Sequence, residues 1–206
     1  MRPATEVFSE WAQIGKDVGM ENGHSAAVSE IIHSAMAHVE ISESGFSAID
    51  AGCGNGWAIR LLAQRDDCVS AIGVDGAPMM IANAKQIDPG GIYIQADLEN
   101  WTPSKPVDLV HSMEVIYYLK DIPGFLSKIR DEWLKKGGVL AFGIDHYFEN
   151  LSCHDWAEKV GVQMAMYSEL EWREMVENAG FEIVDFFRAA KGENWAGTLA
   201  IVALAP

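Results

Sequence analysis

The residues with the clearest chemical potential lie in the run 49–57, where a short apolar strand breaks into three closely spaced glycines, Gly52, Gly54 and Gly56. Glycine lets the backbone turn sharply off a strand and approach a ligand closely, and the helix that follows has free N-terminal amides. The run therefore predicts a nucleotide-cofactor site. Its Gly-x-Gly-x-Gly spacing differs from the Gly-x-Gly-x-x-Gly fingerprint of dinucleotide sites, which disfavours a nicotinamide cofactor.

Two acids follow later strand-like runs. Asp75 ends the apolar run 69–74, where a carboxylate can accept hydrogen bonds from both hydroxyls of a ribose. Asp75 could also serve as the N-terminal acid of a helix that starts near Ala77, and the two roles can coexist. Asp97 could reach an adenine amino group, with the Leu98 amide available to a ring nitrogen, or it could simply cap a turn.

A third group of residues could move a proton. His111 and Glu114 follow the fourth predicted strand, His146 follows the fifth, and His24 lies in the N-terminal segment. A positioned imidazole or carboxylate can take a proton from a reacting group. Each histidine could equally be an ordinary packed or surface residue. The side chains that could line a substrate pocket are Trp11, His24, Tyr117, Tyr118 and Tyr147.

Alternating strands and helices must position these residues. The predicted strands are 46–51, 69–74, 92–95, 107–111 and 139–144, and the predicted helices are 57–64, 77–85 and 122–133. A turn, Lys135-Lys136-Gly137-Gly138, precedes the fifth strand. This alternation predicts an α/β fold with a parallel sheet covered by helices on both faces. In such a sheet, ligands bind at the carboxyl ends of the strands.

The two ends of the chain depart from this alternation of strands and helices. Ser168 and Glu171 form a capping box for a helix that runs through Ala179, and the strands 181–187 and 198–204 predict an antiparallel hairpin. At the other end, a Gly-rich lead-in over 15–23 and a helix over 25–38 predict a flap over the cofactor. We expect one domain, 1–206, with an N-terminal helical flap (1–45), an α/β core (46–206) and a substrate loop (145–167).

Composition excludes several classes of partner. The chain has 30 acidic and 15 basic residues and a formal net charge of −15, so DNA or RNA would be repelled. Three cysteines without metal-ligand spacing support neither disulfides nor a metal site and favour a cytoplasmic setting. No export signal or membrane span is indicated. A monomer and a homodimer remain equally open.

In the order of its motifs the chain resembles the class I S-adenosylmethionine-dependent methyltransferases, over roughly 46–204. The resemblance rests on Asp50-x-Gly52-x-Gly54-x-Gly56, Asp75, Ala96-Asp97-Leu98, Val107-Asp108-Leu109-Val110 and Leu134-Lys135-Lys136-Gly137-Gly138. It implies a Rossmann-like, mostly parallel sheet of seven strands with an antiparallel last strand, and S-adenosylmethionine as cofactor. The cofactor residues that it implies are Asp50, Gly52, Cys53, Gly54, Asn55, Gly56, Asp75, Gly76, Asp97, Leu98 and His111. The Asn/Asp-Pro-Pro-aromatic pattern of amine-methylating members is absent at 111–114.

The predicted activity is methyl transfer to a small-molecule acceptor by in-line displacement, with the acceptor atom left open. Such a displacement needs alignment and exclusion of water more than dedicated catalytic groups. A module that binds S-adenosylmethionine without turnover is the main alternative. A nicotinamide-dependent oxidoreductase is disfavoured by the glycine spacing and by the lack of a separate substrate domain.

Overall fold

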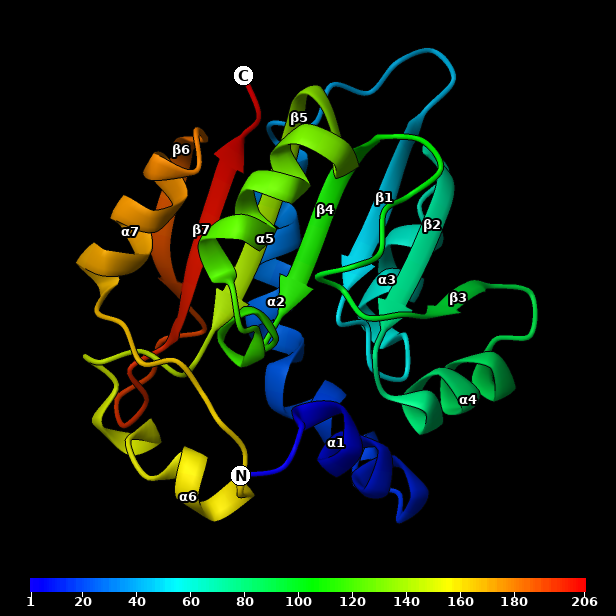
Figure 1. Cartoon of the computed structure of the whole chain (residues 1–206). Helices are drawn as coiled ribbons and strands as arrows, with labels where there is room; N and C mark the ends of the chain where they lie inside the picture. Colours follow the sequence, from blue (N-terminus) through cyan, green and yellow to red (C-terminus); the bar gives the residue numbers. More distant parts are fainter.

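The computed structural model describes residues 1–206 and contains one seven-stranded sheet (Figure 1). The strand order is β3-β2-β1-β4-β5-β7-β6, and β7 alone runs antiparallel to its neighbours. The strands are β1 (Phe46–Ala51), β2 (Cys68–Asp75), β3 (Ile92–Gln95), β4 (Val107–Met113), β5 (Leu134–Ile144), β6 (Glu182–Ala189) and β7 (Thr198–Leu204). The predicted Rossmann-like α/β fold with a reversed last strand is confirmed.

Helices cover both faces of the sheet. The α-helices are α1 (Ala4–Gln13), α2 (Val18–Met36), α3 (Trp57–Ala63), α4 (Pro78–Ile87), α5 (Ile122–Lys128), α6 (Trp156–Val160) and α7 (Glu169–Asn178). The shorter helical segments are the 3₁₀-helices η1 (Ile116–Tyr118) and η3 (Leu151–Cys153) and the π-helix η2 (Ile129–Trp133). One apolar cluster packs α5 and α7 on the sheet, and a second packs α2, α3 and α4 on the opposite face. The sheet is thus buried on both sides, as its apolar strands require.

The strand order reverses between β1 and β4, and this reversal positions the site. From β1 the chain adds β2 and β3 on one side, whereas β4 and β5 extend the sheet on the other. The connections diverge at this point and leave a crevice at the carboxyl ends of β1 and β4. In Figure 1 the arrowheads of β1, β2 and β4 point toward α1.

Four strands have other bounds than predicted: β2 and β6 differ by one or two residues at their ends, and β4 and β5 differ in ways that affect the site or its surroundings. β4 continues two residues past His111, to Met113. β5 begins at Leu134 instead of Val139, because Leu134 pairs with Val107 across a register shift. The predicted Lys135–Gly138 turn is therefore a bulge inside β5, where Gly137 has a φ of 75°.

The N-terminal segment is more helical than predicted. α1 was not expected, and α2 starts at Val18, so much of the Gly-rich lead-in 15–23 belongs to a helix. An added Cβ at Gly19 or Gly23 would meet nothing within 4 Å, so these glycines lie on a free face of α2 and do not interrupt the helix. From Ala27 onward α2 packs in the apolar cluster on the sheet and forms part of the core layer. Over the cavity described below, the segment contributes α1 and the first turns of α2.

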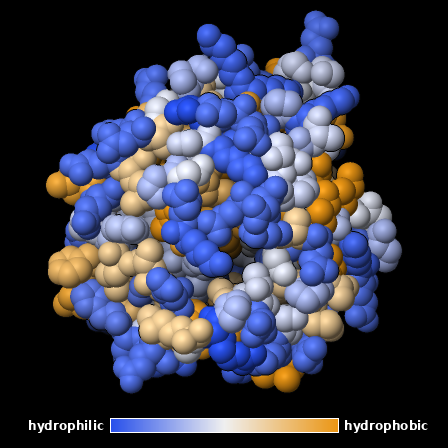
Figure 2. All heavy atoms as spheres, viewed as in Figure 1, coloured by the Kyte–Doolittle hydropathy of each residue, from blue (hydrophilic) through white to orange (hydrophobic).

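The C-terminal predictions are confirmed. Ser168 and Glu171 form the reciprocal capping box of α7, and Gly180, with a φ of 89°, lies directly after the C-cap. β6 and β7 pair as the expected hairpin. Hydrophilic atoms dominate the face shown in Figure 2, in keeping with the excess of acids. None of the helices combines the length and the apolar character that a membrane crossing requires.

Candidate active site

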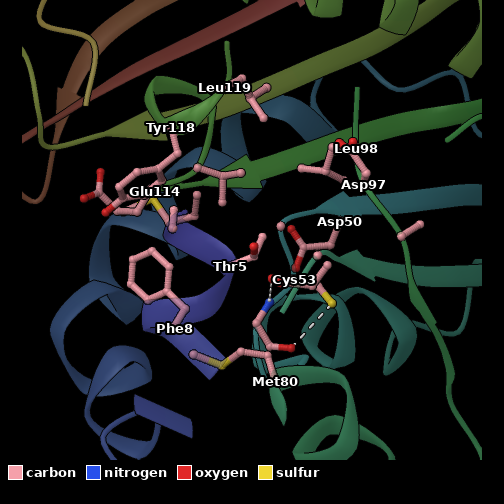
Figure 3. Close-up of a pocket in the computed structure, with 18 of the residues that line it drawn as sticks. Thr5, Phe8, Asp50, Cys53, Met80, Asp97, Leu98, Glu114, Tyr118 and Leu119 are labelled. Atoms are coloured by element: carbon pink, nitrogen blue, oxygen red, sulfur yellow. Dashed lines mark hydrogen bonds between the residues drawn. The ribbon is translucent and has the colours of Figure 1, made fainter. Parts of the chain in front are cut away.

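A cavity of about 540 Å³ lies at the carboxyl ends of the strands, within the range of about 300–1,000 Å³ typical of ligand pockets. Its walls come from the glycine turn after β1, the ends of β2, β3 and β4, and the N-terminal helices α1 and α2. The predicted site residues that line it are His24, Asp50, Gly52, Cys53, Gly54, Asn55, Asp75, Gly76, Asp97, Leu98, Glu114 and Tyr118. Figure 3 shows how ten labelled side chains meet around this space.

The glycine turn has the backbone that its sequence predicts. Gly52, Gly54 and Gly56 have φ values of 79°, 53° and 82°, a region that side chains disfavour. A Cβ added at Gly52 would overlap the side chain of Val115 from the neighbouring loop. Gly56 does not line the cavity and instead precedes α3 as its N-cap. Burial raises the pKa of the Cys53 thiol, which suits a packed residue better than a nucleophile.

Asp75 is fixed at the end of β2 by two backbone amides. Its Oδ2 accepts from the Gly54 amide (2.9 Å) and its Oδ1 from the Ala77 amide (2.7 Å). Burial raises the pKa of Asp75, and the two amides oppose that shift. The carboxylate thus ties the glycine turn to the start of α4 while it lines the cavity, so the helix-start role coexists with a position suited to ligand binding.

Asp97 and Leu98 line the end of the cavity beyond β3. Asp97 accepts hydrogen bonds from the Glu99 amide (3.1 Å) and from Asn100 Nδ2 (2.6 Å), so it caps the turn as well. In Figure 3, Asp97 and Leu98 lie across the cavity from Phe8 and Glu114. The cavity therefore has two ends, which we name after the roles that the sequence predicts for Asp97 and for Glu114: the adenine end (Asp97, Leu98) and the acceptor end (Phe8, Glu114, Tyr118).

Glu114 is the most constrained residue of the acceptor end. It is a non-glycine residue with a φ of 59°. Its carboxylate accepts from the Asp145 amide and from the Tyr117 hydroxyl, the latter at 2.7 Å. Burial and the nearby Asp145 charge raise the pKa of Glu114 well above its ordinary value. A carboxylate that binds a proton more readily than usual and is held in one orientation suits a role in proton transfer.

His24 and Asp145 stand beside this carboxylate. His24 Nδ1 lies 3.5 Å from Asp145 Oδ2, and the Thr198 hydroxyl donates to Asp145 Oδ1 at 2.6 Å. Burial raises the pKa of Asp145, whereas the Thr198 hydrogen bond and His24 lower it. His24 lines the cavity, whereas Asp145 does not and contacts the cavity wall through His24.

Besides Gly56, five predicted site residues do not line the cavity. His111 is fully buried behind Asp50, and Tyr117 is buried below Glu114. Tyr147 is buried and donates to the Gly197 carbonyl (2.8 Å). Because β4 runs to Met113, His111 lies inside a strand, where a side chain packs under the cavity floor.

The remaining two residues also lie elsewhere. His146 is buried beside Trp156, and burial lowers its pKa. Trp11 packs edge-on against Phe8 on α1. No residue of the predicted substrate loop, 145–167, lines the cavity, and its link to the site runs through Asp145 and His24. A direct substrate contact for these residues does not follow from the structure.

Sequence reasoning missed the contribution of α1. Thr5 and Phe8 line the cavity, and the Phe8 ring meets Tyr118 edge-on at 5.2 Å. α1 is held over α4, since Ser9 accepts from the Met79 amide (3.3 Å). The helical spacing of apolar residues along the segment 4–13, at positions 4, 7, 8, 11 and 12, was the available signal for this helix.

The cavity fits an adenosine cofactor with an amino-acid tail. Gly54 faces open space in the cavity, where an added Cβ would meet only Met80 Sδ at 3.8 Å, and Asp75 and Asp97 offer acceptors where a nucleoside has donors. Asn55 is 5% exposed, its amide nitrogen donates to Asp17 Oδ2 (3.1 Å), and its Oδ1 has no protein partner. Buried polar atoms of this kind are normally hydrogen-bonded, and Asn55 Oδ1 is free to accept one hydrogen bond. No group of three or more His, Cys, Asp or Glu side chains is arranged to hold a metal ion.

A family model described as "Methyltransferase domain" matches residues 23–185. The chain belongs to this methyltransferase family. This membership agrees with the resemblance that the glycine turn and the two acids suggest. The fold and the methyltransferase family predicted from the sequence are therefore confirmed.

Two similar proteins align with about half of this chain. It is 32% identical over 117 residues to trans-aconitate 2-methyltransferase from Azoarcus sp. (strain BH72), a match that covers 57% of this chain and 46% of the relative. It is 33% identical over 106 residues to trans-aconitate 2-methyltransferase from Yersinia pestis, which covers 52% and 40%. The chain thus spans less than half the length of these curated relatives.

Solved structures match all or most of the chain. A chain from the complex between the Haloferax volcanii Trm112 methyltransferase activator and a methyltransferase superposes with a TM-score of 0.83 and 27% identity, and covers 100% of this chain and 99% of that one. The N-methyltransferase NodS from Bradyrhizobium japonicum, solved with S-adenosyl-L-homocysteine, has a TM-score of 0.64 and 19% identity over 87% of this chain and 88% of its own. The second likeness concerns the fold alone.

Proposed function

We propose that the chain transfers a methyl group from S-adenosylmethionine to a small-molecule acceptor bound at the acceptor end of the cavity. The observation that carries this proposal is the continuity of one cavity from the glycine turn and Asp75 to Glu114 and Tyr118. A cofactor site and an acceptor site that share one enclosed space allow direct transfer between them.

The residues at the adenine end would hold the cofactor. Asp75 would accept from the ribose hydroxyls, and Asp97 with the Leu98 amide would meet the adenine ring. Asp50 and the turn at Gly52 would receive the amino-acid part. When bound, the cofactor supplies a methyl group activated by a positively charged sulfur.

The residues at the acceptor end would orient the acceptor and take its proton. Glu114 is held by two hydrogen bonds and has a raised pKa, so it can receive a proton from an acceptor that loses one. His24 offers a second position for that proton. Phe8 and Tyr118 give an apolar wall, and α1 covers the cavity and excludes water.

The charge of the lining bears on the acceptor class. The cavity presents Asp50, Asp75, Asp97, Glu99 and Glu114, whereas its one lysine, Lys120, is exposed. Recognition of a tricarboxylate such as trans-aconitate requires several positive groups. We therefore propose a neutral or basic small molecule as the acceptor, distinct from the substrate for which the partial relatives are named.

The test is release of S-adenosyl-L-homocysteine from S-adenosylmethionine across a panel of small amines, phenols, thiols and carboxylic acids. We expect turnover with neutral or basic compounds and its loss in Glu114→Gln. Turnover with trans-aconitate alone would overturn the acceptor class. Cofactor binding without turnover on a broad panel would favour the alternative of a non-catalytic S-adenosylmethionine-binding module.

Two further proposals concern a protein partner and the cellular location of the chain. The full-length likeness to a chain solved with the Trm112 activator supports a similar activator for this chain, in addition to its small-molecule substrate. Comparing turnover with and without a co-expressed Trm112-type protein tests this, and size-exclusion chromatography of the chain alone separates a monomer from a homodimer. A cytoplasmic location is consistent with three unpaired cysteines.

A further inference from the structure

A buried pair of side chains lies directly beneath the cavity. Asp50 on β1 and His111 on β4 are register partners in the sheet, and His111 Nδ1 lies 2.8 Å from Asp50 Oδ1. Their exposed fractions are 2% and 0%. Asp50 lines the cavity and His111 does not. His111 can therefore reach a ligand only through Asp50.

The hydrogen bonding of the pair is asymmetric. A carboxylate oxygen can only accept, so His111 Nδ1 carries the hydrogen and donates it to Asp50 Oδ1. Asp50 Oδ2 is then left for a ligand in the cavity. His111 Nε2 has no partner, and the strand neighbour on the same side, Leu109, lies in the apolar cluster beneath α2. The one polar contact of this imidazole is thus the carboxylate of Asp50.

We infer that His111 is a positioning residue that holds the Asp50 carboxylate in the orientation that receives the ammonium group of the cofactor's amino-acid part. The inference rests on the proposed function. Without the imidazole, the carboxylate would turn about its side-chain bond and Oδ1 would lose its partner in an apolar environment. A charge-assisted hydrogen bond is both stronger and more directional than a neutral one, so it fixes Oδ2 at little entropic cost on binding.

A role confined to packing makes a different prediction. If His111 only filled space and stabilised the sheet, its replacement would loosen the whole site and weaken every ligand that binds there. If it orients Asp50, its replacement weakens only ligands that carry the amino group. 5′-Methylthioadenosine keeps the adenosine of the cofactor and lacks the amino-acid part, so it separates the two cases.

The experiment is isothermal titration of wild type and variants with S-adenosyl-L-homocysteine and with 5′-methylthioadenosine. For His111→Leu we expect S-adenosyl-L-homocysteine affinity to fall about 10- to 100-fold and 5′-methylthioadenosine affinity to change less than about 2-fold. His111→Asn places an amide nitrogen where Nδ1 lies and should restore S-adenosyl-L-homocysteine affinity to within about 3-fold. In an Asp50→Asn background, His111→Leu should cause no further selective loss.

Equal losses for both ligands in His111→Leu, or no recovery in His111→Asn, would overturn the inference. Should His111→Leu fail to fold in a thermal melt, His111→Gln keeps a polar side chain but shifts the donor away from Asp50, and the same selective loss is expected. Failure of wild type to bind either ligand would instead refute the proposed function, so the two outcomes are distinguishable.

Discussion

Replacing Glu114 by Gln is predicted to stabilise the protein at alkaline pH. The pKa of Glu114 is raised well above its ordinary value of 4.5 by burial and by the Asp145 charge. At a pH between the ordinary pKa of the unfolded chain and the raised pKa of the folded protein, Glu114 keeps a proton that the unfolded chain has released. The free energy of unfolding therefore falls as pH rises through that range. Above that range the full penalty of the buried charge is present.

Glutamine removes this charge and keeps both contacts. Its Oε1 can accept from the Asp145 amide, and its amide nitrogen can donate to the Tyr117 hydroxyl. The gain at pH 8 should be about 1–3 kcal/mol in the free energy of unfolding, the scale of an uncompensated buried group. For a chain of this size that corresponds to a rise in Tm of about 2–12 °C.

Thermal unfolding from pH 5 to pH 9, followed by circular dichroism, measures the effect. The Tm of wild type should decline with pH more steeply than that of Glu114→Gln, and Asp75 and Asp145, whose pKa values are also raised, account for the slope that remains. Glu182→Gln on the exposed side of β6 is the matched control and should leave the curve unchanged. A lower Tm for Glu114→Gln at pH 8, or an unchanged slope, would refute the reasoning.

Three further predictions follow from the geometry. Gly52→Ala places a Cβ inside the Val115 side chain at a φ of 79° and should weaken S-adenosyl-L-homocysteine binding about 10-fold or more, as measured by calorimetry. Ser168→Ala breaks the reciprocal bond with Glu171 and should lower the free energy of unfolding by about 1 kcal/mol in a urea titration without changing ligand affinity. Deleting residues 1–13 removes α1 from the cavity and should speed release of S-adenosyl-L-homocysteine in stopped-flow; an unchanged rate would show that α1 does not control exchange.

The sheet could be predicted from the sequence because its signals are local. Each parallel strand is a short apolar run with a polar residue or glycine after it, and the strands 46–51, 92–95 and 198–204 match the structure residue for residue. The bulge at 135–138 could not be predicted, since Lys-Lys-Gly-Gly also suits a turn. Only the pairing of Leu134 with Val107 distinguishes the two.

The site was predictable where it depends on backbone shape. The cavity collects Asp50, Asp75 and Asp97 because parallel strands end at one edge. The positions of His111 and Tyr147 depend on where a strand stops and on which face a side chain lies, and a shift of two residues moved His111 inside β4. The spacing of apolar residues in 4–13 signals the helix α1, but its place over the cavity depends on tertiary contacts with α4, such as the one between Ser9 and Met79.

Isothermal titration with S-adenosylmethionine tests the central claim most directly. The structure predicts saturable, one-to-one binding to wild type and loss of measurable binding in Asp75→Ala, because that change removes the carboxylate that lines the cavity and holds the Gly54 and Ala77 amides. A Gln86→Ala variant on the exposed side of α4 serves as a folded control. Absence of binding to wild type, or near-unchanged affinity in Asp75→Ala, would contradict the assignment of this cavity as the cofactor site.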